Sequence, residues 1–314
     1  MSRLSRLKEI KGIRGTLYRL NQLQTRTGYG VRSISHAARL RLSTNGARLG
    51  ITAVVVGRND DYMPDFRERL EATINWNLKY LVDEVVFVEW NPPPDRPLLA
   101  TGLTGKFDKV RAFVVPAEHH HRVCANSNIK LLEYHAKNVG IRRSQLPWVM
   151  STNADAAVGL DTIAKLMEQP LDQSVVWTAQ RIDIPWRENQ QRTIGLLGSS
   201  RFRRVTPYDP YGTGEFCLAS KDLWHQARGF DEQMVRHRIG CDVRGTAQML
   251  EYGGRLKRAG IVLHLSHPTS CTENIQPHHG ELATIEGVPY YNPENWGLGD
   301  CAEVQLSERV WRLE

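Results

Sequence analysis

Two runs of β-branched and aromatic residues, with a stretch of helical periodicity between them, constrain the fold of this chain most strongly. Residues 51–56 (Ile-Thr-Ala-Val-Val-Val) and 84–89 (Glu-Val-Val-Phe-Val-Glu) read as strands buried on both faces, because they are apolar without alternation. Between them, the apolar residues of 65–81 recur at helical spacing. A strand, a helix and a second strand in this order predict an α/β fold with an open, mostly parallel sheet flanked by helices.

The rest of the chain continues this alternation. We expect further strands at 110–116, 148–152, 174–179, 215–219 and 261–265, and further helices at 126–143, 161–169, 221–227 and 242–253. Residues 181–213 are rich in Arg, Gln, Pro and Gly, which predicts a long loop of the kind that covers an active site. The three consecutive histidines at 119–121 also suggest a loop, because adjacent side chains do not point together on a helix or strand.

Polar side chains follow three of the expected strands at the point where each strand ends. They are residues 58–61 (Arg-Asn-Asp-Asp), Glu89, and Asn153-Ala-Asp155. Ligands of open parallel sheets bind beyond the carboxyl ends of the strands, so we expect these side chains to line one crevice.

The positive charge of the chain is concentrated in its first residues. Residues 1–48 contain eleven Lys or Arg and one acid, and the remaining 266 residues, with 30 bases and 33 acids, carry a net charge of −3. Nucleic-acid binding by the main body is therefore disfavoured. Leucine and isoleucine recur every three or four residues in 1–20. This basic extension could therefore be an arm that binds an anionic membrane surface or a partner, a solvated or disordered extension, or an organelle-targeting peptide.

Several other classes are excluded or disfavoured. No apolar run approaches the roughly 20 residues of a transmembrane helix, and no Gly-x-Gly-x-x-Gly follows an expected strand, which disfavours a dinucleotide-binding dehydrogenase. The five cysteines are widely spaced and contain no Cys-x-x-Cys pair, which points to a reducing compartment. We therefore expect a cytoplasmic protein, with peripheral membrane association left open.

Three short motifs stand in a fixed order around the Asn153-Ala-Asp155 turn. Asn138-Val-Gly-Ile-Arg142 precedes it, and residues 214–224 (Gly-Glu-Phe-Cys-Leu-Ala-Ser-Lys-Asp-Leu-Trp) and Gly229-Phe-Asp-Glu232 follow it. Taken together, residues 51–267 resemble the GT-A glycosyltransferases of the family-2-like group, with a galactosyltransferase-type C-terminal segment. The resemblance implies a Rossmann-like GT-A fold, a nucleotide-sugar donor, with UDP favoured, and a divalent cation, Mn²⁺ or Mg²⁺.

The resemblance also implies roles for individual residues. Asp155 would bind the metal and the diphosphate, His264 or His267 would complete the metal site, and Asp242 would be the catalytic base of an inverting reaction. The residues implied in nucleotide-sugar binding are Arg58, Asp60, Glu89, Asn138, Arg142, Asn153 and Asp155, of which Asn138 and Arg142 are as well explained by structural roles.

Ordinary structural roles remain open for the other candidates too. Asp155 could cap a turn, Asp242 could be the N-cap of the helix expected at 243–252, and His267 could be a structural histidine before a proline. Trp186, in the irregular stretch, could stack on a sugar ring of the acceptor, and Glu215 is a second acceptor-site candidate.

The leading hypothesis is a glycosyltransferase of polysaccharide biosynthesis, which moves a sugar to a hydroxyl of a glycan or a lipid-linked acceptor. Its catalytic domain would span 49–268, with a nucleotide-sugar half at 49–160, an acceptor half at 161–268 and a C-terminal tail, 269–314, packed on the domain. The alternatives are a catalytically silent scaffold docked by the basic arm, and a sugar nucleotidyltransferase, although Gly57 is the only glycine of the loop after the first strand.

Overall fold

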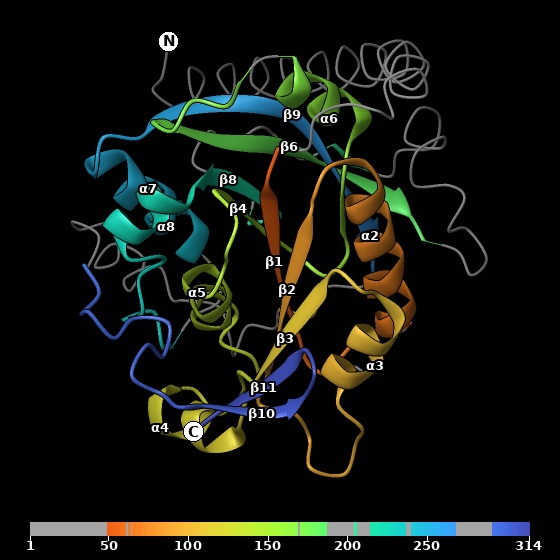
Figure 1. Ribbon diagram of the computed structural model, residues 1–314, viewed down its shortest axis with the longest axis vertical. Helices are drawn as coiled ribbons and strands as arrows, with labels where there is room; N and C mark the ends of the chain where they lie inside the picture. The colour runs from red at the N-terminus through yellow and green to blue at the C-terminus, as the bar shows by residue number, and fades with distance from the viewer. Residues whose placement is uncertain are drawn as a thin grey trace, which may run out of the picture.

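The computed structural model describes residues 49–60, 62–63, 65–168, 170–186, 204–205, 214–236, 240–267 and 291–314 (Figure 1). The basic extension at 1–48, with the membrane arm expected at 1–20, lies outside the described residues. So do residues 187–203 and 206–213 of the loop expected at 181–213. Among the helices that are described, none is both long enough and apolar enough to cross a bilayer.

The described strands form one open, mixed sheet with the order β10-β11-β3-β2-β1-β4-β8-β6-β9-β5, and β7 pairs with β6. The pairs from β11 to β4 are parallel, whereas β8 runs antiparallel to both of its neighbours. The strands are β1 (Ile51–Gly57), β2 (Glu84–Trp90), β3 (Val110–Val115), β4 (Trp148–Thr152), β5 (Ala156–Val158), β6 (Val175–Pro185), β7 (Arg204–Val205), β8 (Phe216–Ser220), β9 (Arg255–Ser266), β10 (Glu303–Ser307) and β11 (Val310–Leu313).

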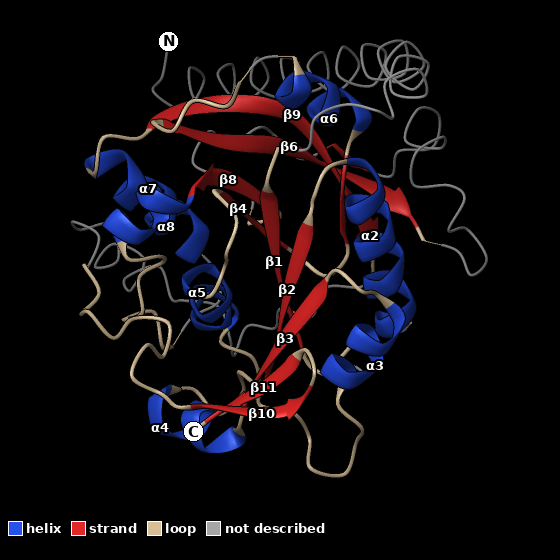
Figure 2. Ribbon diagram, in the orientation of Figure 1, coloured by secondary structure: helices blue, strands red, loops and turns tan. Residues whose placement is uncertain are grey.

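Helices cover both faces of this sheet, which confirms the expected α/β class (Figure 2). In the view of the figures, α2 and α3 lie on one side of the central strands, and α5, α7 and α8 lie on the other. The helices are α2 (Phe66–Tyr80), α3 (Leu99–Lys106), α4 (Ala117–Val123), α5 (Glu133–Arg142), α6 (Leu160–Met167), α7 (Lys221–Ala227) and α8 (Cys241–Glu251).

The central strands are apolar without alternation because both of their faces are buried. In β1, Ile51, Ala53 and Val55 pack into the core under α2 and α3, whereas Val54 and Val56 pack into the core under α5 and α7. Each strand therefore joins two hydrophobic layers. The polar residues that follow these strands consequently lie at the carboxyl edge of the sheet.

Two segments that we expected to be irregular are regular in the structure. Residues 181–185 continue β6, because Ile182 and Ile184 pack into a third apolar cluster while the alternate residues, Arg181 and Asp183, point to the other side. The histidines at 119–121 lie in α4 rather than in a loop, and the buried His120 accepts a hydrogen bond from Trp90 Nε1 at 2.9 Å.

A third segment is less regular than we expected. The helix predicted at 126–143 begins only at Glu133, because the Asn126 side chain accepts the backbone N–H of Asn128 and closes a turn instead. Near the C-terminus, where we expected only a tail, β10 and β11 extend the sheet beyond β3.

Candidate functional site

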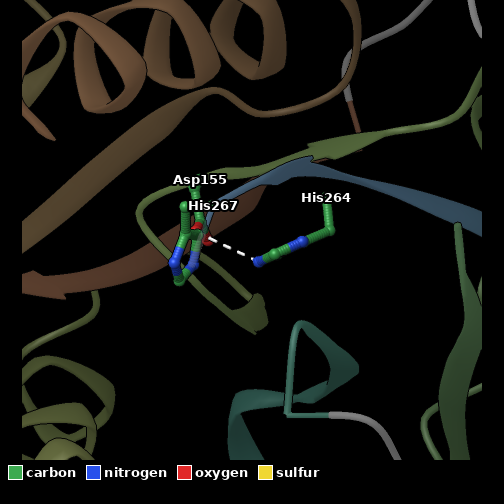
Figure 3. A group of neighbouring side chains, drawn as sticks. All are labelled: Asp155, His264 and His267. Carbon is green, nitrogen blue, oxygen red and sulfur yellow. Dashed lines mark ion pairs between the residues drawn. The ribbon is translucent and has the colours of Figure 1, made fainter. Parts of the chain in front are cut away.

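Asp155, His264 and His267 form a compact cluster at the end of β4 (Figure 3). Oδ2 of Asp155 lies 3.1 Å from Nε2 of His264 and 2.9 Å from Nε2 of His267. Asp155 and His264 are buried and His267 is partly buried. All three offer a ligand atom, and these atoms lie within 4.8 Å of one another, so the three side chains converge on one small volume.

The backbone around the cluster fixes this convergence. Asp155 lies in the turn between β4 and β5, and β5 pairs with β9 so that Ala156 faces His264. The carbonyl of Asp155 accepts the N–H of Leu265 at 2.9 Å. From α2, the buried Arg69 donates to the carbonyls of Leu265 and Ser266, which ties the end of β9 in place just before His267.

A chain of polar contacts extends from the cluster along β6 to the start of β8. Nδ1 of His264 lies 2.9 Å from Asp183 Oδ1 and 2.9 Å from a guanidinium nitrogen of Arg181. Arg181 also contacts Glu215 through its other terminal nitrogen at 2.5 Å. Oε2 of Glu215 is buried and has no hydrogen-bond donor among the described residues, which leaves it able to accept a hydrogen bond from a ligand.

The electrostatics of the cluster suit a divalent cation. Burial alone would raise the pKa of Asp155, but the charges and hydrogen bonds of His264 and His267 hold it well below its usual range. Burial lowers the pKa of His264, but the Asp155 carboxylate more than offsets this and raises it to about 9. The buried carboxylate therefore demands a positive charge, and a divalent cation can supply it in place of the imidazole proton.

The donor set of the cluster also fits such an ion. One carboxylate oxygen and two imidazole nitrogens suit Mn²⁺ better than Mg²⁺, which prefers oxygen ligands alone. Asp183 can accept the Nδ1–H of His264, as carboxylates beside metal-bound histidines commonly do. Asp155, His264 and His267 could thus hold the metal that the sequence analysis implied.

Asp242 lies in the first turn of α8, as its second residue. The N-cap of α8 is Gly240, so Asp242 does not cap a helix that begins at 243, although its carboxylate accepts backbone N–H groups of that turn. Burial, with a smaller contribution from the charge of Glu215, raises the pKa of Asp242 to about 6. A carboxyl with this pKa is ionised at neutral pH and still basic enough to accept a proton.

Asn138 and Arg142 make structural contacts. The amide of Asn138 bonds both the N–H and the carbonyl of Phe230, at 2.7 and 2.8 Å, and so joins α5 to the Gly229-Phe-Asp-Glu232 segment. The guanidinium of Arg142 donates to the carbonyl of Glu294 and lies over the ring of Trp296. A side chain at Gly140 would clash with Val54, so the glycine allows α5 to approach β1 closely.

Arg58 and Asp60 follow β1 and form an ion pair of 2.9 Å between Nε and Oδ2. Arg58 also donates to the carbonyl of Lys130 at 3.2 Å. Burial raises the pKa of Asp60 against the opposing charge of Arg58. The pair lies at the carboxyl edge of the sheet, where polar groups of a nucleotide could reach it.

Glu89 is fully buried at the end of β2, and both of its carboxylate oxygens accept hydrogen bonds. They bind the backbone N–H groups of Leu99 and Ala100, at 3.1 and 2.9 Å, which are the first two residues of α3. Since the N-cap residue, Leu98, has no side-chain acceptor, Glu89 supplies the cap from another strand. This placement favours a structural role for Glu89 over a contact with a nucleotide.

We therefore predict that Glu89→Ala lowers the free energy of unfolding by about 2 kcal/mol, because two buried N–H groups lose their acceptor. Urea unfolding measures this effect, and the exposed Glu68→Ala is the matched control, with an expected change below about 0.5 kcal/mol. Nucleotide affinity at a temperature where both variants are folded should not change. A loss of nucleotide affinity without a loss of stability would instead indicate that Glu89 contacts the nucleotide.

Trp186 lies at the end of the described part of this region, directly after β6. Its ring covers the guanidinium of Arg69, with 5.2 Å between the guanidinium carbon and the ring centroid. Its Nε1 is buried without a hydrogen-bond partner among the described residues. Trp186 is therefore connected, through Arg69, to the end of β9 that precedes His267.

A separate hollow of about 900 Å³ opens at the other end of the same sheet edge. It lies at the carboxyl ends of β3 and β11, and both basic and acidic side chains line it, among them Arg122, Arg312, Glu118 and Asp300. None of the cluster residues lines this hollow, and the mixture of charges does not indicate one kind of ligand.

Comparisons with known proteins give remote structural likenesses. No protein-family model and no curated protein sequence matches the chain. A structure of M. tuberculosis glucosyl-3-phosphoglycerate synthase matches with a TM-score of 0.41 and 13% identity over 78% of each chain, and the same enzyme has been solved with Mn²⁺, UDP and phosphoglyceric acid. Mannosyl-3-phosphoglycerate synthase from Rubrobacter xylanophilus matches with a TM-score of 0.40 and 10% identity over 79% of this chain and 73% of that one. S. aureus TarS matches with a TM-score of 0.40 and 13% identity over 69% of this chain, which spans 35% of the TarS chain.

Proposed function

We propose that this protein is a metal-dependent glycosyltransferase that moves a sugar from a nucleotide-sugar donor, with a UDP-sugar favoured, to a hydroxyl of a glycan or lipid-linked acceptor. One observation carries the proposal. Asp155, His264 and His267 form a cluster whose side chains could bind a metal ion, and hydrogen bonds connect it through Arg181 to Glu215. The charge of Glu215 acts on Asp242, whose carboxyl has a pKa of about 6 and could serve as a general base.

The donor side of the site would be built at the carboxyl edge of the sheet. Arg58 and Asp60 follow β1 and would contact the base and ribose of the nucleotide, and Asn153 would lie near the diphosphate. Asp155, His264 and His267 would hold Mn²⁺. When bound, this ion would supply positive charge to the diphosphate and so stabilise it as a leaving group.

The acceptor side of the site would be built around Asp242. Its carboxylate would take the proton of the acceptor hydroxyl as the oxygen attacks the anomeric carbon of the sugar. The new bond forms from the acceptor oxygen to that carbon, and the bond from the carbon to the diphosphate oxygen breaks on the opposite face. The configuration of the sugar is thereby inverted, the nucleoside diphosphate leaves, and Asp242 keeps the proton until solvent removes it.

Glu215 and Trp186 would bind the acceptor from two directions. Oε2 of Glu215 is buried and has no donor in the described part of the chain, so it could accept a hydrogen bond from a second hydroxyl of the acceptor. The indole of Trp186 lies against Arg69 and offers an apolar surface, and no described residue accepts its N–H. Both contacts would orient a sugar-like acceptor.

The test is the release of nucleotide from a panel of UDP-, GDP-, dTDP- and CMP-sugars by the full chain, with and without Mn²⁺ and with a mixture of simple glycan acceptors. We expect one class of donor to be cleaved, only in the presence of Mn²⁺, with transfer to an acceptor or slow transfer to water. Formation of pyrophosphate from a nucleoside triphosphate and a sugar phosphate would instead indicate a nucleotidyltransferase. Binding of nucleotide without turnover of any donor would favour the silent scaffold.

A further inference from the structure

A buried lysine that the sequence analysis did not single out lies at the centre of the proposed site. The side chain of Lys137, on α5, is fully buried. Its ammonium donates to Oδ1 of Asn153 at 2.7 Å and to the carbonyl of Gly214 at 3.0 Å, and forms an ion pair of 2.8 Å with Glu133. The carboxylate of Glu133 therefore supplies an opposite charge beside this buried ammonium.

These contacts join three segments that carry the proposed chemistry. Asn153 opens the turn that holds Asp155, Gly214 precedes Glu215 at the start of β8, and α5 carries the lysine itself. Gly214 has a positive φ of 66°, and a side chain there would clash with Tyr134 and lie against Asp242. The Gly214 backbone that Lys137 holds therefore lies directly beside Asp242.

We propose that Lys137 is a positioning residue that fixes the Asp155 turn against the start of β8 and, through its charge, keeps Asp242 ionised and able to act as a base. The second part rests on the proposed function, in which Asp242 accepts the proton of the acceptor. The first part depends only on the contacts of the lysine.

The positive charge of Lys137 favours the ionised form of Asp242, which burial and the charge of Glu215 disfavour. Burial raises the pKa of Asp242 most, Glu215 at the start of β8 raises it further, and Lys137 lowers it. The charge of Asp242 also acts on Tyr134 of α5, Cys217 of β8 and Cys241 of α8, and the charge of Glu133 acts on Tyr134 and Cys241 as well. Lys137 is the positive side chain that lowers the pKa of Asp242. Removing this charge should therefore push the pKa of Asp242 upward.

Two variants with opposite expected effects test the proposal. Lys137→Met removes the positive charge and should move the acid limb of the kcat/KM profile to higher pH by about one unit or more. Glu133→Gln removes a negative charge at the partly exposed partner of the lysine, so it should move the same limb to lower pH. Lys137→Arg, which restores the charge, should return the limb toward its position in the unchanged protein, even where its larger head lowers the rate.

A second measurement does not depend on catalysis. The pH dependence of the unfolding free energy, compared in each background with and without Asp242→Asn, reports the pKa of Asp242 in the protein alone. The exposed Lys79→Met is the matched control and should leave both readouts unchanged. If the chain had no transferase activity, this stability cycle would still show or refute the coupling, so a failure of the proposed function is distinguishable from a failure of this inference.

The outcomes are decisive even if Lys137→Met does not fold, because Glu133→Gln alone then carries the test. A uniform loss of rate in the lysine variants, with an unmoved acid limb and an unmoved pKa of Asp242 in all variants, would overturn the electrostatic role. Opposite shifts in the two charge-changing variants would support it, since a purely structural role predicts no such reversal of sign.

Discussion

Asp155→Asn is expected to abolish the binding of Mn²⁺ and to reduce sugar transfer by about 10³-fold or more. The substitution keeps the shape of the side chain but removes the negative charge on which His264 and His267 converge. Loss of a residue that hydrogen-bonds to a metal ligand already weakens metal binding by about 10- to 100-fold, so loss of a charged ligand should weaken it more. Mn²⁺ affinity, measured by electron paramagnetic resonance on the protein without substrate, separates the metal effect from the effect on turnover.

The matched control for this variant is Asp108→Asn, the same chemical change at a fully exposed side chain. It should leave Mn²⁺ affinity and stability unchanged. Asp155→Asn should also change the stability of the metal-free protein, because the imidazole of His264 loses the carboxylate that favours its charged form. Undiminished Mn²⁺ binding by Asp155→Asn would show that the metal is held elsewhere or that the cluster serves only the fold.

Asp242→Asn is expected to lower kcat by about 10²- to 10⁴-fold, the usual contribution of a general base, with little change in Mn²⁺ or nucleotide affinity. The acid limb of the kcat/KM profile of the unchanged protein should lie near the pKa of about 6 that burial imposes on this carboxyl. Activity should therefore rise with pH through that value and be flat above it. Steady-state kinetics between about pH 5 and pH 8 check both statements.

The same raised pKa predicts the pH dependence of stability. A carboxyl whose pKa is higher in the folded state than in the unfolded state costs no stability at low pH, and the cost grows as pH rises from about 4 to about 6. Asp242→Asn removes this cost and should make the protein more stable at pH 8, by up to about 3 kcal/mol. Asp222→Asn, at an exposed position in the first turn of α7, is the control and should change neither kcat nor this pH dependence. A kcat that survives Asp242→Asn would assign the base elsewhere.

The strands and helices with a clear hydrophobic pattern were predictable from the sequence. The central strands β1, β2 and β4 are largely apolar, without polar alternation, because both of their faces are buried. The part of β6 that we took for a loop also carries a strand signal. Residues 181–184 alternate polar and apolar side chains, but their charged members, Arg181 and Asp183, obscured it.

The candidate site was predictable only as separate residues. Asp155, His264 and His267 each follow or end a strand, which marks them as edge residues, but only the pairing of β5 with β9 shows that they meet. Lys137 and Arg69 give no sequence signal, because each lies on a helix, where a charged side chain usually faces solvent. Their burial follows from tertiary contacts to Asn153 and to the end of β9, which a single sequence does not reveal.

The structural contacts of Asn138, Arg142 and Glu89 illustrate a related limit. A polar residue at a strand end or beside a glycine can form hydrogen bonds either to a ligand or to the backbone, and the sequence pattern is the same in both cases. The structure shows the backbone partners of Asn138 and Glu89, which account for their polar atoms. Arg58 and Asp60 remain as the proposed contacts to the nucleotide.

The most direct test of the central claim is the thermal stability of the full chain with UDP, GDP, dTDP or CMP, each with and without Mn²⁺, in parallel with Asp155→Asn. A ligand at about 100 times its dissociation constant stabilises a protein by about 2.7 kcal/mol, which raises the melting temperature by a few degrees. We predict a shift with one nucleotide, with UDP favoured, that needs Mn²⁺ and is lost in Asp155→Asn. The absence of a shift with every nucleotide, or a shift that is the same in Asp155→Asn, would contradict a metal-dependent nucleotide-sugar site at this cluster.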